Sequence, residues 1–336
     1  MATRTRGADA PWLVADIGGT NARFAIYEAS TDPAARPLAQ GRVKTADYPG
    51  PAACTQAFLK EHWNEPVARA ALAIAAPITG DEVALTNADW SFSIAQLRRE
   101  LPVPALDVIN DFAALAHALP LLGPADRRPL GPEPPEAADS PLLVIGPGTG
   151  LGAAAAIPHD KRGWAVATGE GGHTTAAARN DREAAVLRVL RGNSRHVSYE
   201  RVASGPGLVE LAGALAELAE ARPPPRTPAG VVSGAREGDK ICREAVALFQ
   251  DFLATFAGDM ALTLGARGGI YLGGGVLAHL DGLLDIEAFR ARLEDKGRFQ
   301  DYLSRIPVWQ LHRPDAAFLG LRRLLNEHEE DERAAS

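Results

Sequence analysis

Two stretches of the chain share one format, in which an apolar run, a glycine-rich turn and a second apolar run follow one another. They are LVADIGGTNARFAIYE at residues 13–28 and PLLVIGPGTGLGAAAAIP at residues 141–158. Short apolar runs on both sides of a glycine turn predict two β-strands joined as a hairpin, because a helix needs a longer uninterrupted pattern. The turns align on a Gly-Thr pair and the flanking strands align with them, which indicates an internal duplication.

Three glycine-rich turns each follow a predicted strand. Glycine has no Cβ, so backbone N–H groups in such turns can approach and surround an anion, and turns of this kind commonly hold phosphate. One such turn is as well explained by a tight reversal of the chain, but three in one sequence favour a nucleotide site. The candidate nucleotide-binding residues are Gly18, Gly19, Thr20 and Asn21 in the first turn, Gly148 and Thr149 in the second, and Gly273, Gly274 and Gly275 in the third.

Two common phosphate-binding motifs do not fit these turns. The P-loop pattern, Gly-x-x-x-x-Gly-Lys followed by Ser or Thr, does not occur in the sequence. GTGLGA at residues 148–153 matches a dinucleotide-binding pattern, with Glu170 close to the expected acidic position. Pro158 interrupts the segment that follows too early for the required helix. The alanines there are therefore predicted to form the second arm of a hairpin.

Asp16 stands at the end of the first predicted strand, directly before the first turn. A carboxylate in this place can hold a hydrated magnesium ion, through water, near the terminal phosphates of a nucleotide. The alternative is an aspartate that only caps the turn.

Polar residues of a second kind gather in three short stretches. Asn110 and Asp111 stand at a predicted strand-to-helix junction, where Asp111 is either an N-cap or the base that accepts a proton when a sugar hydroxyl attacks a phosphoryl group. Glu170 and His173 in TGEGGHTT flank two glycines that disfavour a helix, so a loop is expected to bring both side chains together for binding hydroxyls. Glu200 lies in RHVSYERV, a helix-like stretch where an isolated glutamate is usually a surface charge.

The composition limits the class of protein. With 336 residues the chain is long enough for two domains of ordinary size. Apolar residues make up 46% and charged residues 23%, values typical of a soluble globular protein. The 35 basic and 42 acidic residues give a net charge of −7 without a block of Lys or Arg, so we expect no nucleic-acid partner.

The cysteine count and the apolar runs bear on location. The two cysteines, Cys54 and Cys242, support neither a disulfide framework nor a cysteine-based zinc site, and a reducing, cytoplasmic setting fits best. We find no signal peptide and no stretch that approaches the ~20 apolar residues of a membrane span. We therefore expect a cytoplasmic protein without a membrane partner.

Strands are predicted to alternate with helices, which indicates an α/β layer. Buried strands are expected at 68–78 and 105–111, helices at 93–101, 111–122, 181–192, 207–221 and 240–265, and a further strand at 268–276. The proline-rich stretches 123–141 and 221–230 are predicted to be loops, and residues 326–336 a charged tail.

Nine motifs in order between about residue 12 and about residue 323 closely resemble the bacterial glucokinase family of the hexokinase and actin-like ATPase superfamily. The motifs are VADIGGTNARFAIYE, AAPITGD, TNADWSFSI, INDFAALAHAL, GPGTGLG, GEGGH, ERVASGPGLVEL, GGIYLGGGV and LEDKGRFQDYLSRIPV. The resemblance implies a two-domain α/β fold of the actin-like ATPase (ribonuclease H-like) type with an interdomain cleft. It also implies a small domain of residues 1–111 plus 314–336, a large domain of residues 112–313, and a homodimer.

The resemblance implies that the protein is a glucokinase, which transfers phosphate from ATP, with Mg²⁺, to the 6-hydroxyl of glucose. Asp111 is similar to the catalytic base of the family. The residues that resemble its sugar contacts are Asn110, Asp111, Glu170, His173 and Glu200. Asp16, Gly19, Thr20, Gly148 and Thr149 resemble its phosphate contacts, and residues 273–275 resemble its adenosine side.

Two departures and two alternatives accompany this interpretation. After GEGGH the chain reads TTAAARND where the family often has an acidic residue and a phenylalanine, and the cysteine-rich zinc site of the related repressor-and-kinase family is missing. One alternative is a catalytically silent sugar-sensing regulator, against which the presence of Asp111 speaks. The other is a hexokinase that uses polyphosphate or ADP as the phosphoryl donor.

Overall fold

The computed structural model describes residues 10–85, 90–160, 163–192 and 195–335 and divides the chain into two compact units. The first unit contains the described residues within 1–123, 159–166 and 313–336, and the second contains those within 124–158 and 167–312. The domain limits expected from the sequence stay a prediction beside this division. Residues 86–89, which belong to the TNADW motif, lie outside the described part of the chain.

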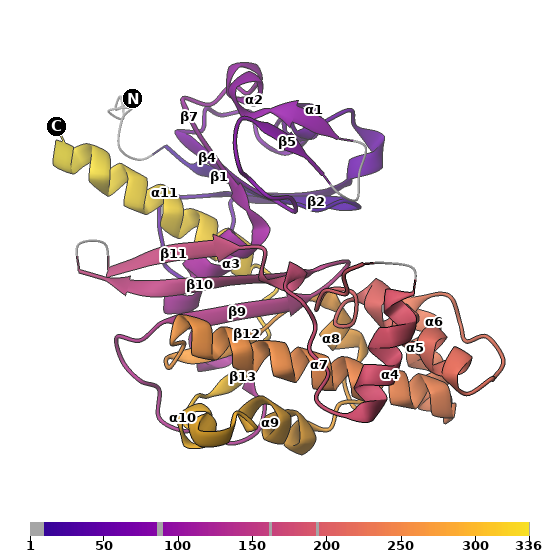
Figure 1. Cartoon of the computed structure of the whole chain (residues 1–336). Coiled ribbons are helices and arrows are strands. Elements are labelled where there is room, and N and C mark those ends of the chain that lie inside the picture. Colours follow the sequence, from indigo (N-terminus) through magenta and orange to yellow (C-terminus); the bar gives the residue numbers. More distant parts are fainter. Residues whose placement is uncertain (1–9, 86–89, 161–162, 193–194, 336) are drawn as a thin grey trace, which may run out of the picture. The chain divides into compact units, whose positions relative to one another are not determined.

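A five-stranded mixed sheet forms the centre of the first unit (Figure 1). In spatial order its strands are β3 (Ala39–Lys44), β2 (Asn21–Tyr27), β1 (Trp12–Ile17), β4 (Arg69–Ile74) and β7 (Ala105–Asn110). β1 and β2 pair antiparallel and confirm the first predicted hairpin. β1, β4 and β7 run parallel, so Ile17, Ile74 and Asn110 lie in register where these strands end. A small hairpin of β5 (Glu82–Ala84) and β6 (Ser91–Ser93) adds to the unit.

Helices cover both faces of this sheet. They are α1 (Pro51–His62), α2 (Ile94–Glu100), α3 (Asp111–Ala118) and α11 (Ala316–Ala335), with short 3-10 turns at Thr45–Asp47 and Leu119–Leu121. One face buries Leu13 and Leu72 against Phe58 of α1, and the other buries Val14 against Leu321 of α11. The charged stretch 326–336 was expected to be a solvated face or a disordered end; residues up to 335 continue α11, and residues 330–334 of this helix are exposed, so a solvated helix face is present rather than a disordered end.

The contact between α3 and α11 is unusually close. A Cβ added at Gly320 of α11 would overlap the backbone oxygen of Ala114 in α3. Glycine at this position therefore lets the two helix backbones touch. Because Asp111 is the first residue of α3, this contact fixes the helix that carries the candidate base.

A six-stranded sheet is central to the second unit, although residues 163–166, in one of its edge strands, are assigned to the first unit. In spatial order its strands are β11 (Gly163–Gly169), β10 (Leu151–His159), β9 (Leu142–Pro147), β12 (Gly269–Leu272), β13 (Val308–Leu311) and β8 (Arg127–Pro129). β9 and β10 pair antiparallel, which confirms the second predicted hairpin. β8 was not expected, because its proline-rich surroundings were interpreted as a loop; Pro129 is accommodated on this edge strand.

Helices of the second unit pack on this sheet and on one another (Figure 1). They are α4 (Asp181–Arg191), α5 (Gly205–Leu218), α6 (Pro228–Glu237), α7 (Lys240–Leu264), α8 (Gly275–His279), α9 (Ile286–Glu294) and α10 (Gln300–Ser304), with 3-10 turns η3 (Pro124–Asp126), η4 (Gly171–His173) and η5 (Gly297–Phe299). α6 was missed, since the loop prediction over 221–230 extended across its first turn, where Pro228 is at a favourable first helical position. The helix-like stretch at 195–202 forms turns and an isolated bridge instead.

α7 is the central helix of the second unit. The Asp239 carboxylate caps its start by accepting the Cys242 N–H, and Gly265 ends it at a φ of +62°. Among the described residues, α7 alone is long and apolar enough to cross a membrane by length and composition, a property not expected from the sequence. The fold buries 72% of its apolar window, as in the core helix of a soluble protein.

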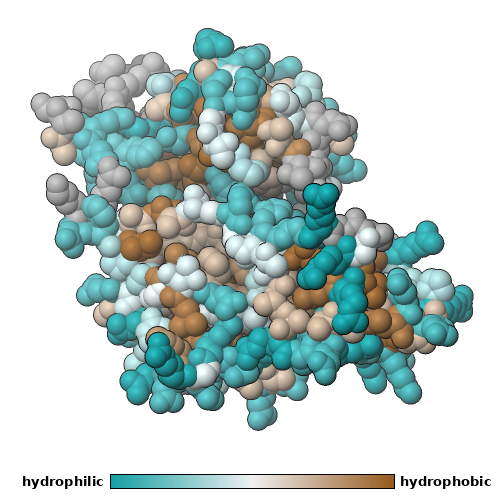
Figure 2. Space-filling view, in the orientation of Figure 1, coloured by the Kyte–Doolittle hydropathy of each residue, from teal (hydrophilic) through white to brown (hydrophobic). Residues whose placement is uncertain are grey.

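The surface in the view of Figure 2 is mostly hydrophilic, with smaller apolar areas between the polar residues. Large apolar side chains that are exposed in the described part of the chain are Leu38, Leu218 and Phe299. Both cysteines are buried and unbridged.

Candidate functional site

The first glycine turn joins β1 to β2 and is held from one side by Thr45. The Thr45 hydroxyl donates to the Gly19 carbonyl oxygen at 2.6 Å, and the Thr45 N–H donates to that of Thr20 at 3.2 Å. In the described part of the chain, the N–H groups of Gly19 and Thr20 donate to no protein acceptor. The turn thus has two backbone donors of the kind that an anion site requires, and binding of phosphate by this turn stays a prediction. Asn21 is occupied differently, since its Oδ1 accepts a hydrogen bond from Arg42 Nε at 3.1 Å.

Asp16 lies next to this turn and faces Arg23 across the hairpin. Arg23 donates two hydrogen bonds to Asp16 Oδ2, one of them from Nε at 3.2 Å. Both contacts use one oxygen, so Oδ1 remains for a water or a cation. No group of three metal-binding side chains occurs among the described residues. This arrangement fits Mg²⁺, which usually keeps several waters and takes one or two carboxylates together with phosphate oxygens.

Asn110 ends β7 and is the N-cap of α3. Its Oδ1 accepts the N–H of Phe112 at 2.9 Å and that of Ala113 at 3.3 Å, while its Nδ2 donates to the Ala76 carbonyl at 3.1 Å. Asn110 is therefore the N-cap of α3, and the N-cap role that was one alternative for Asp111 does not apply to it. Asp111 is the first helical residue, and its Oδ1 accepts the Phe112 N–H at 3.0 Å.

The Asp111 carboxyl group is electrostatically unusual. Burial raises its pKa to about 7, and the negative charge of Asp16 acts in the same direction. Asp16 lies near the carboxyl end of β1, and Asp111 directly follows the carboxyl end of β7. Because these strands are parallel, both residues lie at the same edge of the sheet. A carboxyl group with a pKa near neutrality can both take up and release a proton at physiological pH.

In the second unit the other two glycine turns pack on each other. The Gly273 N–H donates to the Ile145 carbonyl at 2.8 Å. Gly274 has a φ of +91°, and a Cβ there would overlap the Pro147 carbonyl oxygen. The Gly148 carbonyl accepts the N–H of Gly205, the first residue of α5, at 2.8 Å. Another residue at 274 would adopt an unfavourable φ, and its Cβ would overlap the backbone of Pro147, so this position requires glycine. Its absence of a side chain lets the second and third turns lie against each other.

Glu200 and His173 also meet at the second turn. Glu200 Oε2 accepts the N–H of Leu151 at 3.0 Å and lies 3.9 Å from His173 Nε2. The Glu200 N–H donates to the Gly172 carbonyl at 2.9 Å, and a Cβ at Gly172 would overlap the Leu151 carbonyl oxygen. Glycine at 172 therefore allows the GEGGH segment to lie directly on the start of β10.

Glu170 completes this group of polar residues. Its carbonyl accepts the His173 N–H at 3.0 Å, so Glu170 is the N-cap of the short 3-10 turn η4 that ends at His173, and neither residue lies in an α-helix, as expected. The side chains of Glu170 and His173 are exposed. Carboxylates and an imidazole with free hydrogen-bonding capacity can bind the hydroxyl groups of a sugar.

Sequence reasoning missed the residues that hold these groups in place. Arg23 had a detectable signal, because it stands opposite Asp16 in a hairpin whose register follows from the turn. Thr45 had none, since its contact with the first turn depends on the pairing of β2 with β3. Tyr199, which precedes Glu200, was also missed; its hydroxyl donates to Asp259 Oδ2 at 3.0 Å.

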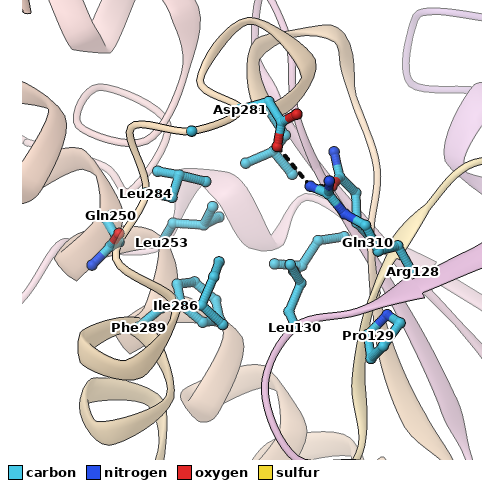
Figure 3. A pocket seen from close by; sticks show the side chains of 13 residues that line it. Arg128, Pro129, Leu130, Gln250, Leu253, Asp281, Leu284, Ile286, Phe289 and Gln310 are labelled. Atoms are coloured by element: carbon cyan, nitrogen blue, oxygen red, sulfur yellow. Dashed lines mark hydrogen bonds and ion pairs between the residues drawn. The ribbon is translucent and has the colours of Figure 1, made fainter. Parts of the chain in front are cut away.

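A separate cavity of about 340 Å³ lies within the second unit (Figure 3). Its wall is largely apolar and includes Leu130, Leu253 and Phe289, while Arg128 and Asp281 form an ion pair at its edge (Figure 3). None of the candidate site residues lines it. This cavity is therefore distinct from the predicted site.

Known proteins resemble the chain along most of its length. The family model described as Glucokinase matches residues 13–328. The glucokinase of Nitrobacter hamburgensis is 44% identical over 322 residues, which cover 93% of this chain and 96% of that protein. The crystal structure of a glucokinase from an Antarctic psychrotroph has a TM-score of 0.83 at 34% identity and covers 94% of this chain and 99% of its own. A ROK family glucokinase from Streptomyces griseus, solved with glucose and AMPPNP, shares the fold with a TM-score of 0.64 at 20% identity, covering 94% of this chain and 98% of its own.

Proposed function

Because the chain belongs to the glucokinase family, we propose that it transfers the terminal phosphoryl group of ATP to the 6-hydroxyl of glucose with Asp111 as the base. The actin-like ATPase fold expected from the sequence is confirmed by the fold of the related sugar kinases. The observation that supports the assigned base is the place of Asp111, at the start of α3 with its pKa raised to about 7.

In this mechanism the Asp111 carboxylate accepts the proton of the glucose 6-hydroxyl. The oxygen attacks the γ-phosphorus of ATP, the bond between that phosphorus and the β,γ-bridging oxygen breaks, and ADP leaves. The transferred group has little covalent chemistry to undergo, so positioning and electrostatic stabilisation supply most of the rate. A base with a pKa near the working pH is well matched to this proton transfer.

The proposed contacts of the sugar hydroxyl groups are polar side chains of the second unit and, in the first unit, Asn110. Glu170, His173 and Glu200 offer acceptors and an imidazole, and Glu200 and His173 already lie within 3.9 Å of each other. Asn110 keeps one Nδ2 hydrogen beyond its bond to Ala76, which a sugar oxygen can accept.

The phosphate tail of ATP is bound by backbone N–H groups of the glycine turns. The donors that Gly19 and Thr20 offer support this role for the first turn, and the packing of Gly274 on Pro147 supports a joint role for the second and third turns. Asp16 would hold Mg²⁺ through water. The ion supplies partial neutralisation of the charge on the phosphates.

We further propose that the protein is cytoplasmic and forms a homodimer, without nucleic-acid or membrane partners. The buried, unbridged thiols of Cys54 and Cys242 support a reducing compartment, and the net charge of −7 speaks against nucleic acid. The dimer is supported by the family resemblance.

Release of ADP from Mg·ATP by the purified protein tests this function, with glucose, fructose, mannose, N-acetylglucosamine or no sugar. We expect release that depends on glucose, and a kcat lower by ~10² or more for Asp111→Ala with glucose binding retained. Near-normal turnover by this variant would contradict the assignment of the base. Silence with every sugar would favour polyphosphate or ADP as the donor, tested next, and then a sugar-sensing regulator.

A further inference from the structure

One motif of the sequence, LEDKGRF at residues 293–299, has no role in the site described above. It begins in α9 and continues into η5. We use the name α9 end for residues 292–296, and the name sugar segment for the described residues from Glu170 to Glu200, which are 170–192 and 195–200. Polar groups of the α9 end reach the sugar segment at three points.

The first contact is a buried ion pair. Arg292 Nη2 donates to the two carboxylate oxygens of Glu183 at 2.7 and 2.8 Å, and the Glu183 side chain is 0% exposed. Glu183 Oε2 also accepts the Arg179 N–H at 2.6 Å. This buried carboxylate holds its neighbours firmly, because loss of the Arg292 guanidinium would leave a buried charge without its ion-pair partner.

The second contact lies beside the first. Arg179 Nη1 donates to the Asp295 carbonyl oxygen at 2.8 Å, and its Nη2 forms an ion pair with the Asp295 carboxylate. Arg179 follows His173 by six residues in the sequence. The α9 end therefore fixes the part of the sugar segment that leads away from His173.

The third contact is a chain of three side chains that ends next to Glu200. Lys296 Nζ donates to Asp259 Oδ1 at 2.5 Å, and the Tyr199 hydroxyl donates to Asp259 Oδ2 at 3.0 Å. Tyr199 is 3% exposed, and burial together with the nearby Asp259 carboxylate raises its pKa, so the hydroxyl stays protonated and donates. Its ring packs on Phe256 of α7 with a centroid distance of 5.2 Å.

Glycine in α7 makes the approach of the α9 end possible. A Cβ at Gly258 would lie 2.6 Å from the Leu293 carbonyl oxygen and 3.0 Å from Lys296 Cε. Both are shorter than ordinary van der Waals contacts. The position of Lys296 is thus set by backbone packing as well as by its charge, which suits a residue that has to hold another one in place.

We propose that Asp259 and Lys296 are positioning residues that hold Glu200 through Tyr199. The inference rests on the proposed function, since it takes Glu200 as a glucose contact. Tyr199 and Glu200 also bind the start of the sugar segment through their backbones, with Tyr199 N–H to the Thr174 carbonyl at 3.0 Å and Glu200 N–H to that of Gly172 at 2.9 Å. A displaced Tyr199 side chain would therefore displace both ends of the segment.

Substitutions along this chain test the proposal by comparing glucose KM, ATP KM and kcat. Tyr199→Phe removes only the hydroxyl, and Lys296→Met removes only the charge from a side chain of similar length. We expect each to raise the glucose KM about 3- to 10-fold, the effect of one lost hydrogen bond, with kcat and ATP KM unchanged. Lys296→Arg should restore most of the glucose affinity. The glucose KM of the double variant Tyr199→Phe/Lys296→Met should resemble that of the weaker-binding single variant, because both substitutions interrupt the same chain of hydrogen-bonded side chains.

Arg182→Met is the matched control, since it removes an exposed ion pair between α4 and Glu244 of α7 that does not lead to Glu200. It should leave the glucose KM unchanged. An unchanged glucose KM in Tyr199→Phe and Lys296→Met, or a loss confined to kcat and melting temperature, would overturn the proposal. Fully multiplicative effects in the double variant would do the same.

Calorimetric glucose binding without ATP separates failure of this proposal from failure of the proposed function. If the wild type binds glucose but releases no ADP, the assignment of ATP as the phosphoryl donor fails, and the affinities of the variants still test the positioning role. If the wild type turns over glucose while the variants bind it normally, the positioning role alone fails. Absence of glucose binding in the wild type contradicts both.

Discussion

The Glu200 carboxylate accepts a hydrogen bond from the backbone N–H of Leu151 at 3.0 Å. Leu151 is the first residue of β10, directly after the turn that contains Gly148 and Thr149. One hydrogen bond thus joins a proposed glucose contact to the turn proposed to bind phosphate. We therefore expect a shift of the Glu200 carboxylate or of the turn to move the other group, because this hydrogen bond joins them.

Gly150→Ala should weaken glucose binding through this relationship. A Cβ at Gly150 would lie 2.5 Å from Glu200 Oε2, so the flexible carboxylate has to move away from Leu151. We expect a glucose KM higher by about tenfold with little change in melting temperature. Gly213→Ala in α5 is the control, since a Cβ there meets nothing within 4 Å. Unaltered glucose KM in Gly150→Ala would show that this position of Glu200 is not the binding one.

The pH dependence of kcat/KM for glucose should show an acid limb with a pKa of about 7. The raised pKa of Asp111 means that the carboxylate needed as base is lost as the pH falls through that value. Asp16→Asn removes the charge that helps to raise it and should move the limb to lower pH. Asp107→Asn, which removes a carboxylate that contacts His328 instead, should leave the limb in place. A limb at the ordinary aspartate value in the wild type would contradict this assignment.

Gly320→Ala should destabilise the protein although alanine is the better helix former. The added Cβ would overlap the Ala114 backbone oxygen, and backbone atoms in a packed helix pair cannot move aside cheaply. We expect a loss of about 1–3 kcal/mol in unfolding free energy, measured by urea denaturation. Gly213→Ala, also inside a helix but in open space, should instead be neutral or stabilising by about 0.5–1 kcal/mol. Equal effects of both substitutions would contradict the close helix contact.

His117, in the last turn of α3, should make the protein sensitive to mild acid. Burial is the main cause that lowers the pKa of His117 to about 4, and the positive charges of Arg323 and His328 lower it further. The Glu327 carboxylate lies 3.5 Å from His117 but does not offset this effect, because it forms an ion pair with Arg323. Between pH 6.5 and about 4 the His117 side chain is protonated in the unfolded state but neutral in the folded state. The stability that is present above pH 6.5 is therefore lost as the pH falls toward 4.

The His117→Gln variant checks this expectation, since its side chain stays neutral at every pH. Its melting temperature should fall less than that of the wild type between pH 7 and pH 5. His279→Gln, at an exposed position, is the control and should follow the wild type. The same fall in His117→Gln as in the wild type would exclude His117 as the source of acid sensitivity.

The parts of the fold that follow from local pattern could be predicted from the sequence. Both hairpins were, because glycine between two apolar runs leaves few other structures. The junction at Asn110 and Asp111 was also recognisable, since a strand pattern changes there into a helix pattern. The polar residues themselves were identified by type and spacing, whereas their roles stay a prediction.

The parts that depend on distant contacts could not be predicted. The stretch 195–202 has apolar residues at helical spacing, but its backbone pairs with residues 174–176, more than twenty positions earlier. The end of α11 looked like a solvated tail because its charges conceal a helix, which is supported by ion pairs four residues apart such as that of Glu329 with Arg333. Local charge patterns of this kind are compatible with helix and coil alike.

The cover that α11 provides for one face of the first sheet has a consequence for how the protein is made. Val14 and Ala71 lie on strands synthesised early, but their packing partners Leu321 and Leu325 come roughly 250 residues or more later. While the ribosome is still translating the second unit, that face of the sheet lacks its own helix and exposes apolar side chains. The first unit therefore cannot be completed until its last helix has been synthesised, although most of its residues are synthesised before the second unit.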